Sequence, residues 1–204
     1  MRTSFVGPPI DDAAILGMVP DEIAQAWRGQ NGFLSADGGF HFRGACIAPR
    51  WHSIRFVWLG DFALHRLFPS VMTTDIPLAQ DCFGDQYLLR DTHVVRLSGE
   101  TGEIEQLQMG WDEFLRRVDS EPVEFLQLQY LDRFRQEGGV LLPGQLLSVY
   151  PPFVSTYEGD RSIRAIPALE HISWLADFSR QIANVPDGAQ IDIRVVQNPN
   201  DKRS

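Results

Sequence analysis

Residues 76 to 118 read IPLAQDCFGDQYLLRDTHVVRLSGETGEIEQLQMGWDEFLRRV, and short β-prone runs alternate there with turn residues. Two of these runs, at 86–90 and 93–97, are separated by Asp91-Thr92, which suits a two-residue hairpin connection. The run before them, from 76 to 81, ends at a Gly-Asp turn. The segment therefore predicts strands that follow one another as neighbours in a meander.

The next turn, at 98–102, is predicted more strongly than the first. Gly99 and Gly102 lie within it, and glycine supplies the positive φ that such turns demand. A third strand is predicted over 103–109. Its alternation breaks near Gln106-Leu107, so we expect a β-bulge at that point.

A short helix is predicted directly after the meander, over 111–118. Its apolar residues recur at helical spacing, and they are Trp111, Phe114, Leu115 and Val118. Acidic residues occupy the first turn and two arginines the last, which suits the helix dipole at both ends. A meander closed by a helix predicts an α+β fold with a mixed or antiparallel sheet covered by helices.

These motifs resemble the SUKH superfamily, which includes fungal regulators of cell-wall (glucan) synthesis and bacterial immunity proteins that neutralise toxins. The matching residues, in order, are Asp81, Gly84, Asp85, Thr101, Gly102, Glu103, Phe114 and Leu115. An earlier family signature, a Pro-initiated helix that ends in Asn-Gly, matches 20–32, so the resemblance spans about 15–120. It implies a non-enzymatic protein-binding module, with an immunity protein as the first hypothesis and a regulator of glucan synthesis as the alternative.

The chain changes character after Glu121-Pro122, so we expect a SUKH-like core over 1–120 and a C-terminal elaboration over 121–204. The elaboration is predicted to contain helices at 122–136 and 168–183 and strands at 145–150, 163–166 and 191–195. Because these strands can extend the same sheet, one compact unit is favoured over two independent domains.

The chain is acidic, with a formal net charge of −9 and a pI of about 4.9. Such a surface argues against nucleic acid or an anionic membrane as partner and suits a basic protein, for example a nuclease toxin. The alternative is that the charge serves solubility alone. The aromatic residues of 51–68 are interpreted as core packing rather than as a stacking surface for single-stranded nucleic acid.

Two cysteines, Cys46 and Cys82, make neither a disulfide framework nor a zinc site, and we interpret them as small buried residues in a reducing compartment. The first residues contain no apolar run typical of a signal peptide, and charges or prolines interrupt every apolar segment. The sequence therefore predicts a cytoplasmic protein, and it leaves the oligomeric state open.

The five histidines show no metal-ligand spacing, and no phosphate loop or nucleophile elbow is present, so no cofactor, metal or catalytic residue is predicted. Asp61 and His65 are four residues apart in a predicted helix of the aromatic segment. We interpret Asp61 as an N-cap and His65 as a surface residue rather than as a catalytic pair.

One group of polar residues is a candidate for binding a partner or a ligand: Asp75, Asp81, Asp85 and Gln86. Asp81 and Asp85 flank Gly84 and can lie close across a turn, where two carboxylates can exchange protons or hold a cation. A hydrolase or small-ligand binder that uses this pair is therefore the alternative from another functional class. The competing interpretation is that the aspartates accept hydrogen bonds from turn amides.

Overall fold

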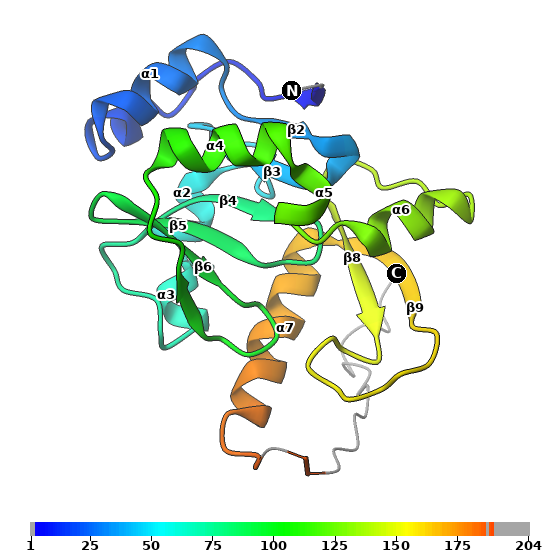
Figure 1. Cartoon of the computed structure of the whole chain (residues 1–204). Helices are drawn as coiled ribbons and strands as arrows, with labels where there is room; N and C mark the ends of the chain where they lie inside the picture. The colour runs from blue at the N-terminus through cyan, green and yellow to red at the C-terminus, as the bar shows by residue number, and fades with distance from the viewer. Residues whose placement is uncertain (1–2, 187, 190–204) are drawn as a thin grey trace, which may run out of the picture.

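The computed structural model describes residues 3–186 and 188–189, and within them a seven-stranded antiparallel sheet follows the order of the chain (Figure 1). Its strands are β1 (Thr3–Val6), β2 (Phe33–Ser35), β3 (Phe40–Phe42), β4 (Ile76–Asp81), β5 (Gln86–Arg90), β6 (His93–Leu97) and β7 (Ile104–Gln106). Together with the helices, this sheet confirms the α+β class and the predicted meander.

Helices lie against both faces of the sheet. They are α1 (Asp21–Gly29), α2 (Ile54–Trp58), α3 (Leu64–Leu67), α4 (Trp111–Ser120), α5 (Pro122–Phe125), α6 (Gln129–Gln136) and α7 (Ala168–Ile182), with 3-10 turns η1 (Ala13–Gly17) and η2 (Ala36–Gly38). Successive residues of β5 enter two different apolar clusters: Tyr87 lies in the cluster that contains Phe114 of α4, and Leu88 lies in the cluster that contains Leu175 of α7. The sheet therefore lies between α4 and α7 (Figure 1).

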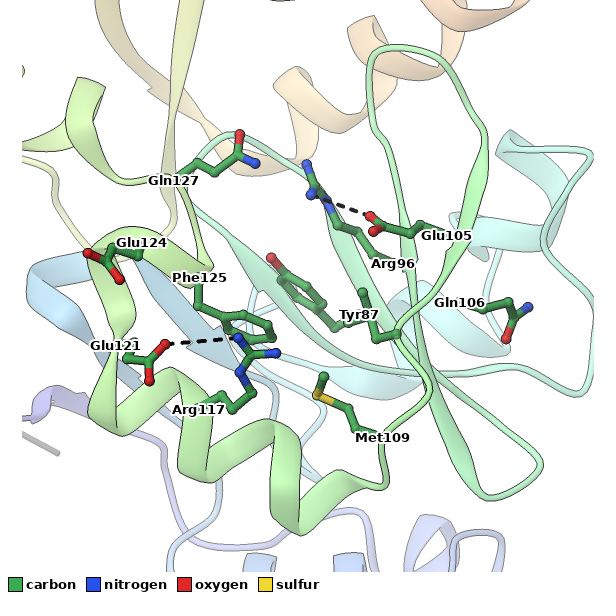
Figure 2. Close-up of a pocket in the computed structure, with 11 residues that line it drawn as sticks. Tyr87, Arg96, Glu105, Gln106, Met109, Arg117, Glu121, Glu124, Phe125 and Gln127 are labelled. Carbon is green, nitrogen blue, oxygen red and sulfur yellow. Dashed lines mark ion pairs between the residues drawn. The ribbon is translucent and has the colours of Figure 1, made fainter.

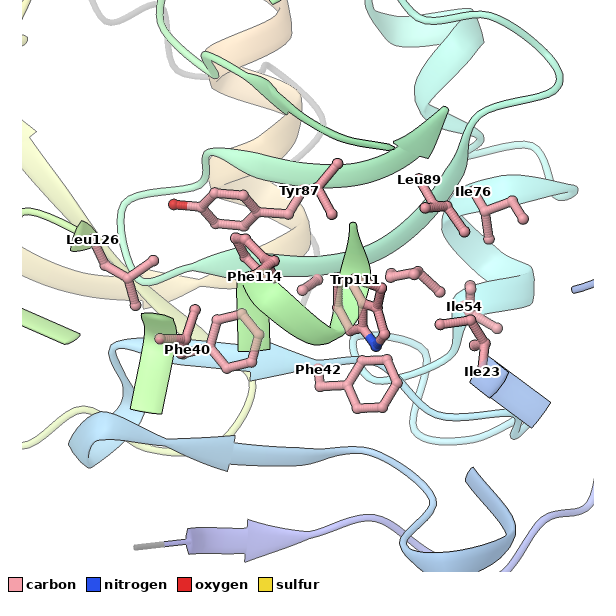
Figure 3. Packing of buried hydrophobic residues seen from close by; sticks show 14 of the residues in the cluster. Ile23, Phe40, Phe42, Ile54, Ile76, Tyr87, Leu89, Trp111, Phe114 and Leu126 are labelled. Atoms are coloured by element: carbon pink, nitrogen blue, oxygen red, sulfur yellow. The ribbon is translucent and has the colours of Figure 1, made fainter. Parts of the chain in front are cut away.

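The predicted helix over 111–118 is confirmed and is the centre of the larger cluster. Phe114 is fully buried, 4.8 Å from the ring of Tyr87 on β5 and 5.9 Å from that of Phe40 on β3. Trp111 contacts Phe42 at 5.1 Å, so the two rings of α4 lie across three neighbouring strands (Figure 3). The amphipathic stripe read from the sequence is the stripe that packs here.

The β5–β6 hairpin has the predicted register, with Arg90 opposite His93 and Asp91 in the left-handed region at φ 54°. The predicted extent of the third strand is wrong, because β7 ends at Gln106. Backbone pairing with β6 resumes after an irregularity at Gln108, which also has a positive φ of 55°. The irregularity therefore lies at 107–109, directly beside the Gln106-Leu107 position at which the bulge was expected.

The C-terminal third contains β8 (Gln145–Tyr150) and β9 (Ser162–Pro167), which pair with each other as a separate antiparallel hairpin. The prediction that these strands extend the main sheet is therefore wrong. A hydrogen bond of 2.7 Å from the Leu147 amide to the Cys82 carbonyl joins β8 to the turn after β4. The division at residue 120 stays a prediction, although Leu131 and Leu147 lie in the same cluster as α4.

Two further expectations differ from the structure. The single helix over 122–136 is two helices, because Gln127 has a φ of 55° between α5 and α6. Asp61 is not an N-cap, because α3 begins at Leu64 and Ala63 occupies the N-cap position. The Asp61 carboxylate instead forms an ion pair of 3.6 Å with Arg66. The sequence indicated neither β1 nor β2, and the strand predicted at 191–195 lies outside the described residues.

Candidate functional site

The turn between β4 and β5 is built on the Asp81 carboxylate. Its Oδ1 accepts hydrogen bonds from the backbone amides of Phe83 (2.9 Å), Gly84 (3.0 Å) and Asp85 (3.1 Å). Gly84 has a φ of 103°, and a Cβ there would lie 2.5 Å from Leu175 Cδ1 of α7. Glycine is therefore required both by the backbone conformation and by the packing of α7. The interpretation of Asp81 as an acceptor for turn amides is confirmed.

The Asp85 carboxylate joins this turn to the next one. Its Oδ2 accepts from Arg96 Nε at 2.7 Å, and its Oδ1 accepts from the Gly99 amide at 2.8 Å. Of the two glycines expected to supply positive φ in the 98–102 turn, Gly102 does so at 72° and Gly99 does not. Gly99 instead permits a close approach, because a Cβ there would lie 2.8 Å from Leu175 Cδ1.

The other two candidate residues also face inward. Asp75 is buried and pairs with Arg90 through two hydrogen bonds, 2.8 Å to Nε and 2.7 Å to Nη2. Gln86 is fully buried, and its Oε1 accepts from Arg43 Nη2 at 2.6 Å. Burial lowers the pKa of Arg43 to about 9, and its acceptors are amide and backbone oxygens. Asp75, Asp81 and Gln86 therefore present no side chain to a protein partner in this conformation.

The protonation of Asp81 is set by competing effects. Burial, and then the neighbouring carboxylate of Asp85, raise the pKa of Asp81 to about 8, whereas Arg96 and the turn amides oppose the rise. Burial and Asp85 therefore favour the protonated form of Asp81, and Arg96 and the turn amides favour the ionised form. Its Oδ2 lies 3.4 Å from the Tyr87 hydroxyl, and burial raises the pKa of that phenol well above its ordinary value. The cluster of Asp81, Asp85, Tyr87 and Arg96 is thus a hydrogen-bonded part of the protein scaffold.

A pocket of about 410 Å³ opens in front of this cluster, between the sheet and the α4–α5 segment (Figure 2). Its lining residues are Tyr87, Arg96, Glu105, Gln106, Leu107, Met109, Arg117, Glu121, Glu124, Phe125 and Gln127. Gln127 lines the pocket, and Gln108 lies between two lining residues. Both have a positive φ, and the backbone changes direction at them, just after β7 and α5 end. The pocket therefore lies next to the points where β7 and α5 end, and both elements are shorter than the sequence predicted.

The arginines of the pocket are already paired within the molecule. Burial is the largest single effect and lowers the pKa of Arg96, but Asp85, Tyr87 and Asp81 together outweigh burial and raise it. Arg96 Nη1 also lies 3.6 Å from the exposed Glu105. Arg117 lies over the ring of Phe125, 4.6 Å from its centroid, and 3.9 Å from Glu121 (Figure 2). The ion pairs Arg96–Glu105 and Arg117–Glu121 are long and solvent-exposed, so each contributes little to stability.

The mouth of the pocket carries three exposed glutamates, Glu105, Glu121 and Glu124. The floor is formed by buried or partly buried Tyr87 and Phe125. Asp81 and Asp85, the pair on which a hydrolase would depend, are not among the lining residues. Within the described part of the chain, no group of three or more His, Cys, Asp or Glu is arranged to hold a metal ion. The arrangement can attract and contact a cationic group at its rim.

The pocket residues were not singled out from the sequence. Their juxtaposition depends on α4 crossing the sheet, which places Glu121 and Glu124 opposite Glu105, and spacing along the chain does not show this. The signal that was present is the cluster of charges around the Glu121-Pro122 boundary. Both cysteines, Cys46 and Cys82, are described and are buried free thiols. In residues 3–186 and 188–189, none of the helices combines the length and the apolarity needed to cross a membrane.

Comparison with known proteins adds information on the fold. No protein-family model matches the sequence, and no curated protein matches it. A solved structure described as the crystal structure of Atu4351 from Agrobacterium tumefaciens is similar, with a TM-score of 0.51 and 15% sequence identity. The match covers 86% of this chain and 85% of that chain. At this identity the likeness shows a shared fold alone.

Proposed function

We propose that this protein is a non-enzymatic binding module of the SUKH type that acts as an immunity protein, neutralising a basic toxin by covering its functional surface. The ordered motifs of the sequence support the family assignment, and the antiparallel meander closed by α4 supports the expected architecture. The free buried thiols of Cys46 and Cys82 support a reducing compartment, so we place the protein in the cytoplasm.

The observation that carries the proposal is the acidic rim of the pocket. Glu105, Glu121 and Glu124 are exposed around one concavity. Arg96 is paired mainly with Asp85, and Arg117 offsets one of the three glutamates, so the rim keeps an excess of negative charge. Such a rim favours a cationic partner, and a formal net charge of −9 increases the rate of encounter at long range. Binding without turnover is supported by Asp81 and Asp85, whose oxygens accept hydrogen bonds within the scaffold.

The experiment begins with affinity capture from the native cell and continues with the purified partner. We expect a basic protein whose activity falls with one-to-one stoichiometry and whose covalent mass is unchanged after incubation. We expect the association rate to fall with increasing ionic strength, while the dissociation rate changes less. A partner that is chemically altered by this protein, or that keeps its activity in the complex, would contradict the proposal.

Two charge variants distinguish the effect of the rim residues on association from the effect of the overall net charge. The first replaces the rim residues, as Glu105→Gln, Glu121→Gln and Glu124→Gln; the second replaces exposed acids elsewhere, as Asp21→Asn, Glu22→Gln and Glu170→Gln. Both remove three negative charges. We expect the rim variant to reduce the association rate by roughly tenfold and the control by much less. Equal reductions would show that net charge, rather than the pocket rim, guides the partner.

A further inference from the structure

An exposed apolar surface lies outside the pocket, in the connection that follows β8. Residues 150–157, called here the 150–157 loop, present four large apolar or aromatic side chains to solvent. Their exposed fractions are 51% for Tyr150, 39% for Phe153, 46% for Val154 and 48% for Tyr157. Single exposed apolar residues are ordinary, but four within eight residues form a patch that needs an explanation.

The loop is held from inside by Arg161, a buried side chain. Its Nη1 donates to the carbonyls of Pro151 (2.6 Å) and Pro152, and to Ser155 Oγ at 3.3 Å. Its Nη2 donates to the carbonyls of Ser155 (3.2 Å) and Tyr157 (3.0 Å). The Arg161 guanidinium thus donates hydrogen bonds to four backbone carbonyls of the loop. Lysine cannot replace it, because a single ammonium group lacks the planar set of N–H donors.

A second anchor comes from the 98–102 turn. The Glu100 carboxylate accepts from the Phe153 amide at 2.9 Å and from the Val154 amide at 2.8 Å. The preceding residue, Gly99, donates its own amide to Asp85. The 98–102 turn therefore holds the loop in place, although it is remote from the loop in sequence.

The base of the loop packs against aromatic rings on both sides. The Phe153 ring meets Phe83 edge-on at 5.4 Å and Tyr130 at 5.0 Å. Tyr130 lies three residues after Gln127, which lines the pocket, so the loop and the pocket adjoin through the start of α6. The half of Phe153 that remains exposed is thereby held in a defined orientation.

We propose that the 150–157 loop is a preformed docking surface that inserts its apolar side chains into a complementary apolar depression framed by cations on a basic protein. This inference rests on the proposed function and names the surface that carries the affinity. A rigid loop loses little conformational entropy on binding, and exposed aromatic side chains supply a large contact area. The pocket rim guides the encounter, and the loop makes the contacts that hold the complex.

The acidic residues next to the loop indicate the charge of the partner surface that the loop fits. From Tyr150 to Asp160 the chain carries two acidic residues, Glu158 and Asp160, and neither lysine nor arginine. Both acids are exposed beside the apolar patch, and Asp160 lies 4.0 Å from Arg133 in a long, exposed pair that leaves its carboxylate largely in solvent. A cationic frame around the partner's depression would complement them, whereas a second copy of this chain would place like charges opposite each other. An anionic membrane is disfavoured for the same reason.

The test locates the contact by photo-cross-linking in the native cell. A phenylalanine derivative that bears a benzophenone replaces Tyr150 in one full-length chain and Val6, which is 61% exposed and distant in the sequence, in another. We expect the Tyr150 position to capture a basic protein and the Val6 position to capture it weakly or not at all. Capture of a second copy of this chain, of an acidic protein, or of the same protein equally at both positions would overturn the proposal.

The captured protein is then purified and its dissociation constant is measured with two surface variants. The loop variant is Val154→Ser with Tyr157→Ser, and the control is Val6→Ser with Met18→Ser, whose residues are similarly exposed. We expect the loop variant to weaken binding at least tenfold and the control less than twofold. Circular dichroism and thermal melting of each variant confirm that the chain is folded.

The outcomes separate this inference from the function on which it rests. Unchanged affinity of the loop variant, with stoichiometric inhibition intact, would overturn the docking surface and leave the immunity function standing. A partner that binds through the loop but keeps its activity would overturn the immunity function and leave the docking surface standing. Binding of the wild-type chain to vesicles of phosphatidylcholine and phosphatidylglycerol, lost in the loop variant, would assign the loop to a membrane instead and overturn the proposal.

Discussion

Polar and apolar side chains face opposite directions in two adjoining regions, the paired turns at 81–85 and 98–102 and the 150–157 loop. In the turns, carboxylates point inward and accept hydrogen bonds from backbone amides and Arg96. In the loop, a buried arginine holds the backbone, and aromatic and aliphatic side chains point outward. The difference teaches that the carboxylates of the turns stabilise the scaffold, whereas the loop exposes an apolar surface. Substitutions in the turns should therefore reduce stability, and substitutions on the loop surface should not.

The largest loss is expected for Asp81→Ala. The substitution leaves the amides of Phe83, Gly84 and Asp85 without the carboxylate that accepts them, in a buried turn beneath α7. We expect the free energy of unfolding to fall by about 3 kcal/mol. Chemical denaturation measures it. A loss below about 0.5 kcal/mol would show that water satisfies the turn and that Asp81 is not structural.

The next largest effect is expected for Gly84→Ala, compared with Gly138→Ala. Both glycines have positive φ, but a Cβ at Gly84 meets Leu175, whereas a Cβ at Gly138 meets open space. We expect losses of about 2–3 kcal/mol at Gly84 and about 1 kcal/mol at Gly138, because only the first adds a steric clash to the backbone strain. Equal losses in thermal melting would mean that α7 does not pack tightly on the turn.

A smaller effect depends on pH and is measured by comparing Asp81→Asn with the wild-type protein. Because the pKa of Asp81 is raised to about 8 from an ordinary 3.8, the folded protein keeps a proton that the unfolded chain releases between these values. Its contribution to stability is complete below about pH 4 and is lost as pH rises through about 8. Asparagine stays neutral and still accepts the amides, so the variant should gain in melting temperature relative to wild type as pH rises from 5 to 9. A constant difference across that range would show that the amides keep Asp81 ionised.

The smallest change in stability is expected on the loop. Val154→Ser and Tyr157→Ser replace exposed side chains without removing any bond to Arg161 or Glu100, since those bonds involve backbone atoms. We expect the free energy of unfolding to change by less than about 0.5 kcal/mol. A loss comparable with that of Gly84→Ala would mean that these side chains support the fold, and the contrast between turns and loop would disappear.

Local periodicity explains what was predictable. The stripe of α4, the β5–β6 hairpin and the Gly-Asp turn at 84–85 depend on residues that are close together in the sequence. β1 and β2 are too short to show a pattern, and neighbouring strands define them. The pair Asp81 and Asp85 was found as a candidate site, but whether a carboxylate faces inward or outward depends on distant groups such as Arg96 and α7.

The site was less predictable than the fold for the same physical reason. The pocket depends on how α4 and α5 cross the sheet, and Gln108 and Gln127 set its edges through backbone conformations that their residue type does not require. The loop conformation is set by Glu100, whose carboxylate meets amides 53 and 54 residues away. Contacts of that sequence separation leave no periodic signal.

Amide hydrogen exchange at Phe153 and Val154 tests most directly whether the turns hold a preformed loop. In the free wild-type protein we expect both amides to exchange slower than an unstructured peptide, on the order of a hundredfold or more, because the Glu100 carboxylate accepts both. Glu100→Ala should abolish this protection while the amides of β5 and β6 stay protected. Exchange of both amides at the rate of an unstructured peptide in the wild-type protein would contradict the account, because the loop would then not be formed before a partner binds.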